Sequence, residues 1–155
     1  MRKVQRITSL CLSAVFAAVM LGGIAQARQK TLEELKADAA KAHGGHRAEL
    51  YSELALRTVD VANQQFTKGN SVEAQKTVQD IFDYATQAHD AALEKHKKMK
   101  DVEIHLRETQ RQLENLRRTL AAEDRPPVED VEKKISDFRQ DLLNAMFGWN
   151  KKGKK

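Results

Sequence analysis

Residues 78–120 read VQDIFDYATQAHDAALEKHKKMKDVEIHLRETQRQLENLRRTL, and this stretch decides the fold. Apolar residues recur in it at alternating spacings of three and four over about six heptads, a pattern typical of a helix with a coiled-coil seam. Only two seam positions, Lys95 and Thr109, are not apolar. The full seam consists of Val78, Ile81, Ala85, Ala88, Ala92, Lys95, Met99, Val102, Leu106, Thr109, Leu113, Leu116 and Leu120.

No glycine or proline stands between Gly69 and Pro126. We therefore predict one helix over residues 71–122, about 75 Å long at a rise of about 1.5 Å per residue. Shorter helices are predicted by the same spacing and by flanking glycine and proline signals over residues 32–43, 46–68 and 127–147.

The predicted helix lengths match one another. Residues 46–68 can lie antiparallel on 71–93, and 128–147 can lie antiparallel on about 102–120. The expected fold is all-α, a helical domain over residues 28–149 in which hairpins pack on a long central coiled-coil-like helix. The alternative is a break in the charged stretch 94–101, with Asp101 as a new cap, which would give a compact four-helix bundle.

Short signals mark the expected helix ends. Thr31 with Glu34, and Asn70 with Glu73, have the spacing of capping boxes, in which side chain and backbone of the first turn satisfy each other. Gly69 suits a left-handed helix end. These signals predict a tight antiparallel hairpin around residues 68–70.

The first 27 residues have the order of a secretory signal peptide. Arg2, Lys3 and Arg6 precede an uncharged apolar run over residues 7–24, and a small-x-small sequence ends at Ala27. We expect cleavage after Ala27 and an exported, periplasmic or extracellular protein. The alternative is a retained membrane anchor, because about 18 apolar residues approach the length of a membrane span.

Removal of residues 1–27 would change the charge and the cysteine content. The whole chain has 27 Lys and Arg against 22 Asp and Glu, and one cysteine, Cys11. The remaining chain would have no disulfide and no thiolate site, and it would be close to neutral outside a basic tail over residues 150–155. A nucleic-acid partner is therefore not expected.

Residues 50–92 resemble one tetratricopeptide-type hairpin. Leu54-Ala55 stands where that family has its Leu-Gly pair, Lys68-Gly69-Asn70 resembles its turn, and Ala74 falls at the small residue that opens its second helix. The first helix is about two turns too long, the closing proline is missing and there is no second repeat. The resemblance implies a protein-interaction role for this hairpin.

Few residues have the spacing of a chemical site. His43 and His46 flank Gly44-Gly45, which we expect to stop the first helix, and two imidazoles so placed could bind a divalent metal. No phosphate-binding glycine loop, haem-attachment motif or catalytic triad spacing is present. We therefore predict a protein that is not an enzyme and has no cofactor.

The remaining hypotheses concern binding. The leading one is an exported protein of the cell envelope that acts as an adaptor, scaffold or holdase through the seam, where Lys95 and Thr109 would set partner choice. Lys97, Lys98 and Lys100 would add charge to the same partner-binding stretch. Alternatives are a metal or small-ligand sensor using His43 and His46, and a protein that binds an anionic membrane or wall surface through its tail. The tail lysines are Lys151, Lys152, Lys154 and Lys155. The heptads are equally compatible with self-association.

Overall fold

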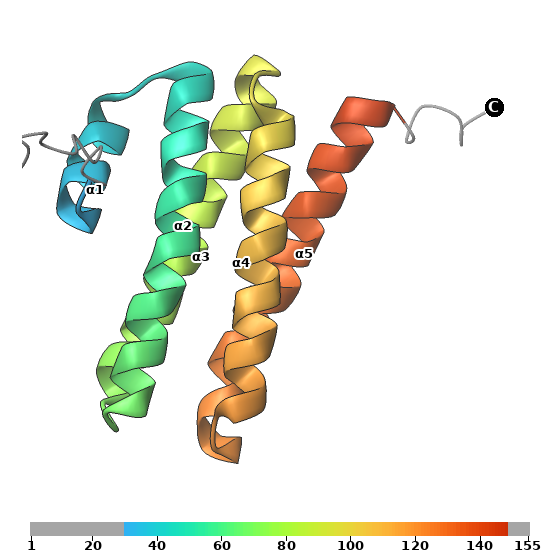
Figure 1. Ribbon diagram of the computed structural model, residues 1–155. Helices are drawn as coiled ribbons and strands as arrows, with labels where there is room; N and C mark the ends of the chain where they lie inside the picture. Colours follow the sequence, from blue (N-terminus) through green and yellow to red (C-terminus); the bar gives the residue numbers. More distant parts are fainter. Residues whose placement is uncertain (1–29, 149–155) are drawn as a thin grey trace, which may run out of the picture.

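The computed structural model describes residues 30–148, and these fold into helices only. Four long helices form a bundle, and a short one lies on its outside (Figure 1). The elements are α1 (Leu32–Lys41), α2 (Gly44–Thr67), α3 (Ser71–Lys95), α4 (Met99–Thr119), a 3-10 turn η1 (Ala122–Asp124) and α5 (Arg125–Phe147). The all-α prediction is confirmed. The predicted signal peptide and the tail lysines lie outside the described residues.

The four long helices run alternately up and down. α2 packs most extensively on α3, and α4 on α5, while α2 also contacts α4 and α3 also contacts α5. The α1–α2 and α3–α4 connections and the end of α5 therefore lie at one end of the bundle, and the other two connections lie at the opposite end (Figure 1). α1 packs against the outer side of α2.

The predicted continuous helix over residues 71–122 is wrong. α3 ends at Lys95, and α4 begins at Met99 after a three-residue loop in which His96 and Lys98 have left-handed backbone angles, with φ of 48° and 62°. The chain reverses there, so the seam folds back on itself and the alternative of a compact four-helix bundle is the observed one. Lys98, and not Asp101, is the N-cap of α4.

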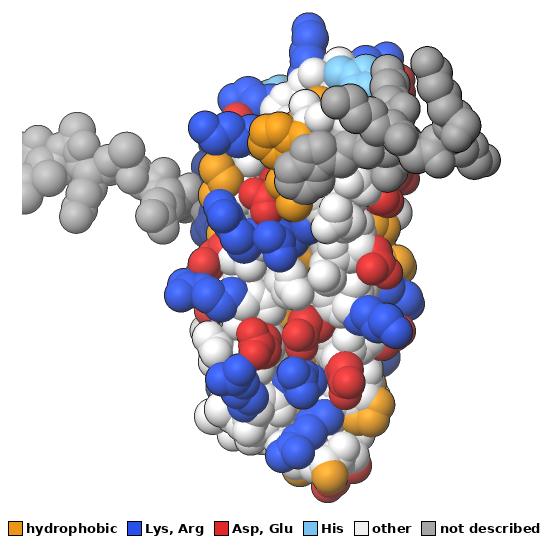
Figure 2. Space-filling model, turned by 90° about the vertical axis from the view of Figure 1, so that its right-hand side faces the viewer, with side chains coloured by type: hydrophobic (Ala, Val, Ile, Leu, Met, Phe, Trp, Pro, Cys, Tyr) orange, Lys and Arg blue, Asp and Glu red, His pale blue; other side chains and the backbone are white. Residues whose placement is uncertain are grey.

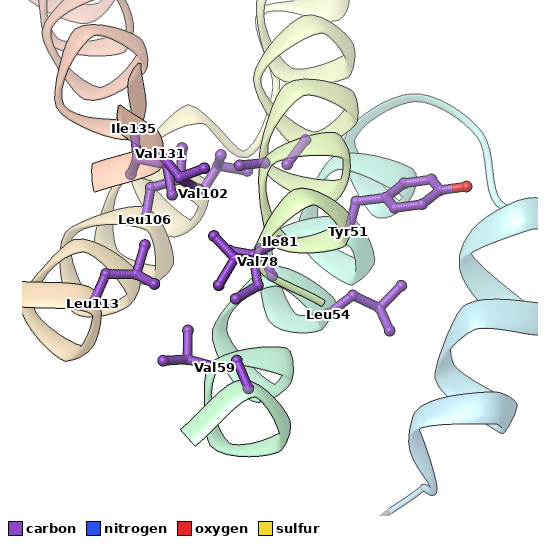
Figure 3. Packing of buried hydrophobic residues seen from close by; sticks show 14 of the residues in the cluster. Tyr51, Leu54, Val59, Val78, Ile81, Val102, Leu106, Leu113, Val131 and Ile135 are labelled. Carbon is purple, nitrogen blue, oxygen red and sulfur yellow. The ribbon is translucent and has the colours of Figure 1, made fainter. Parts of the chain in front are cut away.

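The core runs the length of the bundle and uses the predicted seam. Ile81, Leu106 and Leu113 are fully buried and belong to one core cluster with Leu54 of α2 and Ile135 of α5 (Figure 3). Alanines that are fully buried let α2 and α3 approach closely: Ala48, Ala55, Ala62, Ala85 and Ala88. Every buried hydrophobic residue among those described lies between Leu35 and Leu142. A chain of residues 28–155 therefore keeps the whole described core.

The helix ends follow the sequence signals in part. Thr31 and Glu34 form the predicted capping box, with Glu34 N donating to Thr31 Oγ1 at 3.2 Å and Thr31 N donating to Glu34 Oε2 at 2.8 Å. Gly69 has the expected left-handed φ of 77°. Asn70 is the N-cap of α3, but its side chain makes no capping hydrogen bond, so the second predicted box is not formed.

One charged pair is almost enclosed between α4 and α5. Arg139 donates from Nε and Nη2 to Glu103 Oε1 at 3.1 and 2.9 Å, and from Nη1 to Gln110 Oε1 at 2.6 Å. The side chain of Glu103 is 9% exposed and that of Arg139 is 22% exposed. Glu103 Oε2 also lies 3.8 Å from Arg107 Nη2, whereas Glu103 is the one acidic partner of Arg139 within the described residues. Removing Glu103 therefore leaves the partly buried Arg139 charge without compensation.

Within residues 30–148, no helix combines the length and the apolar character needed to cross a bilayer.

Candidate functional site: a cationic end of the bundle

Three segments that are distant in sequence lie at the same end of the bundle, the upper one in Figure 1. They are the start of α2 with the residues before it, the α3–α4 loop with the adjoining helix turns, and the last turn of α5. We call this region the cationic end and define it as residues 41–50, 94–101 and 144–148.

The approach of the α3–α4 loop to α2 depends on Gly45. This residue is buried, and a Cβ atom added to it would lie 2.9 Å from Lys97 Cβ and 3.1 Å from Lys98 Cγ. A side chain at position 45 would therefore push the loop away. The loop itself contains two non-glycine residues, His96 and Lys98, in the left-handed region, which costs about 1–2 kcal/mol for each.

The cationic end differs in charge from the rest of the fold. It contains six Lys and Arg, three Asp and Glu, and three of the five histidines. The other described residues contain 13 Lys and Arg against 19 Asp and Glu. The formal charge is therefore +3 at this end and −6 over the remainder. Figure 2 shows acidic and basic side chains mixed along one side of the bundle, with Lys, Arg and His side chains prominent at its upper end.

Some of these cations are paired and others are not. Lys98 Nζ lies 3.0 Å from Asp101 Oδ2 and 3.4 Å from Glu49 Oε1, and these two hydrogen-bonded carboxylates raise the pKa of Lys98. Lys97 and Lys100 are exposed and form no ion pair within residues 30–148. These two lysines are therefore available to an external anion.

A shallow hollow of about 600 Å³ lies beside the cationic end, between the start of α2 and the last turns of α3. Its lining carries both signs of charge, since it includes Arg47 and Lys95 as well as Asp90 and Glu94. The Arg47 guanidinium is held in place, because Nη2 donates to Gln87 Oε1 at 3.2 Å and the group lies over the Tyr51 ring at 5.3 Å. The mixed lining gives the hollow no single ligand preference.

The structure brings most of the predicted site residues together. The four lysines predicted to bind a partner (Lys95, Lys97, Lys98 and Lys100) lie at this end with His43 and His46, whereas a continuous helix over residues 71–122 would have the lysines at its middle. Thr109 is different: it is fully buried and its hydroxyl donates to the carbonyl of His105 at 2.8 Å. The role predicted for Thr109 in choosing a partner is therefore wrong, because the seam there faces the core.

His43 and His46 both lie exposed at the start of α2, where His43 is the N-cap. Within residues 30–148, no cluster of three or more His, Cys, Asp or Glu side chains is arranged to hold a metal ion. His46 Nδ1 instead lies 3.9 Å from Glu49 Oε2. The double glycine belongs to α2, since α1 already ends at Lys41 and Gly44 begins the next helix with φ of 58°.

Two histidine contacts between helices had no signal in the sequence. His105 Nδ1 lies 2.8 Å from Ser52 Oγ, and the same hydroxyl lies within hydrogen-bond distance, 2.8 Å, of the carbonyl oxygen of Glu49. Ser52 is fully buried. The Ser52–His105 pair joins α2 to α4.

The second is His89 of α3, which is stacked on Phe138 of α5 with ring centroids 4.5 Å apart. Its Nδ1 lies 2.9 Å from Asp90 Oδ1, while Nε2 is buried without a hydrogen bond and lies 3.7 Å from Asp141 Oδ2. The contact links α3 to α5 one to two turns below the cationic end.

Comparisons with known proteins found no match: no family model, no curated protein and no solved structure is similar to this chain.

Proposed function

We propose that this is an exported, non-enzymatic docking protein of the cell envelope that binds an anionic partner through the cationic end of its bundle. The observation that carries the proposal is the segregation of charge, +3 at one end against −6 over the rest of residues 30–148. A charge separated along the axis of a rigid bundle orients the molecule toward a negative surface and speeds its encounter with that surface.

The proposed binding surface is the cationic end of the bundle, not the helix seam that the sequence had favoured. The seam residues Leu106, Thr109 and Leu113 are buried within the bundle, so a partner helix has no access to them. The lysines of the α3–α4 loop remain exposed at the end. Binding is therefore expected to be electrostatic and end-on. The protein would act as an adaptor or scaffold by binding a second partner along the rest of the bundle.

The test uses two variants of equal total charge. Lys97→Glu/Lys100→Glu changes the cationic end from +3 to −1, whereas Lys68→Glu/Lys76→Glu makes the same change at the opposite end of the bundle. Fluorescence anisotropy would measure the binding of labelled polyglutamate, a model anionic surface, to residues 28–155.

We expect wild-type protein to bind polyglutamate at about 0.02 M salt and to weaken steeply toward about 0.2 M, as the Debye length shortens. The first variant should lose at least about tenfold in affinity, by loss of two attractive charges and gain of two repulsive ones. The second should bind like wild type. Equal losses in both variants would show that net charge, and not the cationic end, determines binding, and would refute the proposal.

A further inference from the structure

The short helix α1 is not part of the four-helix bundle but lies along its outside (Figure 1). Its inner face is apolar, and Leu35 and Ala39 are fully buried members of the core cluster. Just before α1, the carbonyl of Lys30 accepts a hydrogen bond from Arg57 Nη2 of α2 at 2.8 Å. α1 therefore covers an apolar surface of the bundle that would face solvent without it.

The surface under α1 is built from α2 and α3. Tyr51 and Leu54 point from α2 toward α1 (Figure 3), and Tyr51 is stacked on Tyr84 of α3 with ring centroids 6.2 Å apart. Lys36 of α1 lies over the Tyr84 ring, with Nζ 5.9 Å from its centroid. We call Tyr51, Leu54 and Tyr84 the α1-binding surface. It fits a short helix that has an apolar stripe with a lysine beside it.

The connection from α1 to α2 has the features of a hinge. It consists of two residues, Ala42 and His43, which are both extended, with ψ of 157° and 153°. Gly44 follows in the left-handed region, with φ of 58°, and this conformation lets α1 fold back along α2. A change of Gly44 to helical backbone angles would straighten the connection and direct α1 away from its own bundle.

We propose that α1 exchanges between two copies of the chain, so that the α1 of each copy occupies the α1-binding surface of the other. The segment that fits this surface is α1 itself, and a second copy supplies an identical one. Exchange therefore restores the same contacts in both copies and changes only the hinge and the junction between them. The inference goes beyond the docking function and does not depend on it.

Exchange would bring two cationic ends together, because the hinge lies within the cationic end. The three peptide units from Lys41 to Gly44 span at most about 11 Å. In the exchanged dimer, Lys41 lies at the cationic end of one copy and Gly44 at that of the other. The two ends, with a formal charge of +3 each, are then adjacent and repel each other. The dimer should therefore become tighter as added salt screens this repulsion.

Gly44→Ala tests the hinge. Alanine disfavours the left-handed angles of the folded-back hinge by about tenfold, whereas it is a better helix residue than glycine in a straightened one. Because a dimer contains two hinges, the dimer dissociation constant of residues 28–155 should fall about 100-fold, as measured by sedimentation equilibrium. Among the described residues, the atom nearest to the new Cβ is Lys95 Cγ at 3.7 Å, so the substitution does not crowd the fold.

Gly69→Ala is the matched control. Gly69 also has a left-handed φ, of 77°, and a Cβ added to it has no atom of the described residues within 4 Å. It lies in the α2–α3 connection at the opposite end of the bundle. Gly69→Ala should lower stability and leave the dissociation constant unchanged. Circular dichroism spectra would establish that both variants keep the fold.

Cross-linking shows to which copy α1 belongs. Residues 28–155 contain no cysteine, so one copy can carry Lys36→Cys in α1 and another Asp80→Cys, which is exposed one turn before Tyr84 on α3. After the two proteins are mixed at high concentration, a short bis-maleimide should join them into a hybrid dimer, because α1 of the first lies on the second.

A Gly44→Ala protein that stays monomeric at every concentration would refute the exchange. So would a dimer that yields no hybrid cross-link, since its two copies would associate with each α1 still on its own bundle. A dimer that weakens with added salt would contradict the placement of the two cationic ends. The binding of polyglutamate by monomeric protein is a separate result, so the exchange can fail while the docking function holds, and the reverse.

Discussion

Replacing Gly45 by alanine should destabilise the protein by about 1 kcal/mol, because the added methyl group has no room beside the α3–α4 loop. Alanine in a helix is favoured over glycine by about 0.5–1 kcal/mol, so helix propensity alone predicts the opposite sign. The new Cβ would lie 2.9 Å from Lys97 Cβ, an atom fixed to the backbone, and 3.1 Å from Lys98 Cγ, which can rotate. Overpacking of this kind costs about 1–3 kcal/mol and outweighs the propensity term.

A double-mutant cycle isolates the contact. Lys97→Gly removes the Cβ that Gly45→Ala would meet, so alanine at position 45 should be neutral or stabilising in that background. Urea unfolding followed by circular dichroism would give the four free energies, with an expected coupling of about 1–2 kcal/mol. If Gly45→Ala alone stabilises the protein and the coupling is zero, the loop does not lie against the start of α2 and the cationic end is not assembled as described.

Three further predictions concern other parts of the fold. Glu103→Ala should lower the free energy of unfolding by about 2–3 kcal/mol, because it leaves the Arg139 charge uncompensated. The double variant Glu103→Leu/Arg139→Met should come within about 1 kcal/mol of wild type. Equal losses of stability in the two variants, measured by urea unfolding, would contradict an enclosed ion pair at this position. His96→Gly should raise stability by about 1 kcal/mol in a thermal melt, because glycine adopts the left-handed conformation without strain; a lower melting temperature would contradict it. The hydrogen bond from Lys30 lowers the pKa of Asp38. The small contribution of this pair to the free energy of unfolding is therefore present above the unfolded-state pKa of about 4, and it is lost as the pH falls through the lower, folded-state pKa. Asp38→Asn should remove that part of the acid dependence, and identical curves of unfolding free energy against pH for the two proteins would refute the prediction.

The elements with local signals were predictable from the sequence. The apolar spacing located α2 and α5 and the helical residues of α3 and α4, although it joined the last two into one helix. The Thr31–Glu34 capping box formed as expected because its partners are three residues apart. The core positions also followed from the pattern, since Ile81, Leu106 and Leu113 are all fully buried. Such features depend on neighbours along one helix and not on the rest of the fold.

The chain reversal was missed because the heptad phase passes through it unchanged. Lys95, Met99 and Val102 keep the alternating spacing although the backbone leaves the helix between the first two. The two left-handed residues of the loop are His96 and Lys98, so the glycine that usually marks such a turn is absent from the loop. The glycine that permits the turn is Gly45, about 50 residues earlier, which faces Lys97 across the bundle end.

The cationic end was predictable in its residues but not in its assembly. The lysines between residues 95 and 100 stood out as a cluster, and His43 and His46 as another. Only the reversal of the chain brings the two clusters to one place and turns the middle of an expected rod into an end. For the same reason the pairings of Glu103 with Arg139 and of Ser52 with His105 could not be predicted, because each joins residues from different helices.

The distance between the start of α3 and the end of α4 tests the central claim most directly. Residues 28–155 contain no cysteine, so spin labels can be placed at Val72→Cys and Thr119→Cys, which are both exposed. In the bundle these positions lie at the same end, on the diagonally opposed helices α3 and α4. Because neighbouring helices pack at about 8–10 Å, the diagonal distance is only slightly larger, and we expect a label separation of about 30 Å or less. A continuous helix would separate them by about 70 Å. A pulsed electron-resonance distance near 30 Å is the result we expect, and one near 70 Å would show that the lysines lie along a rod and that the cationic end does not exist.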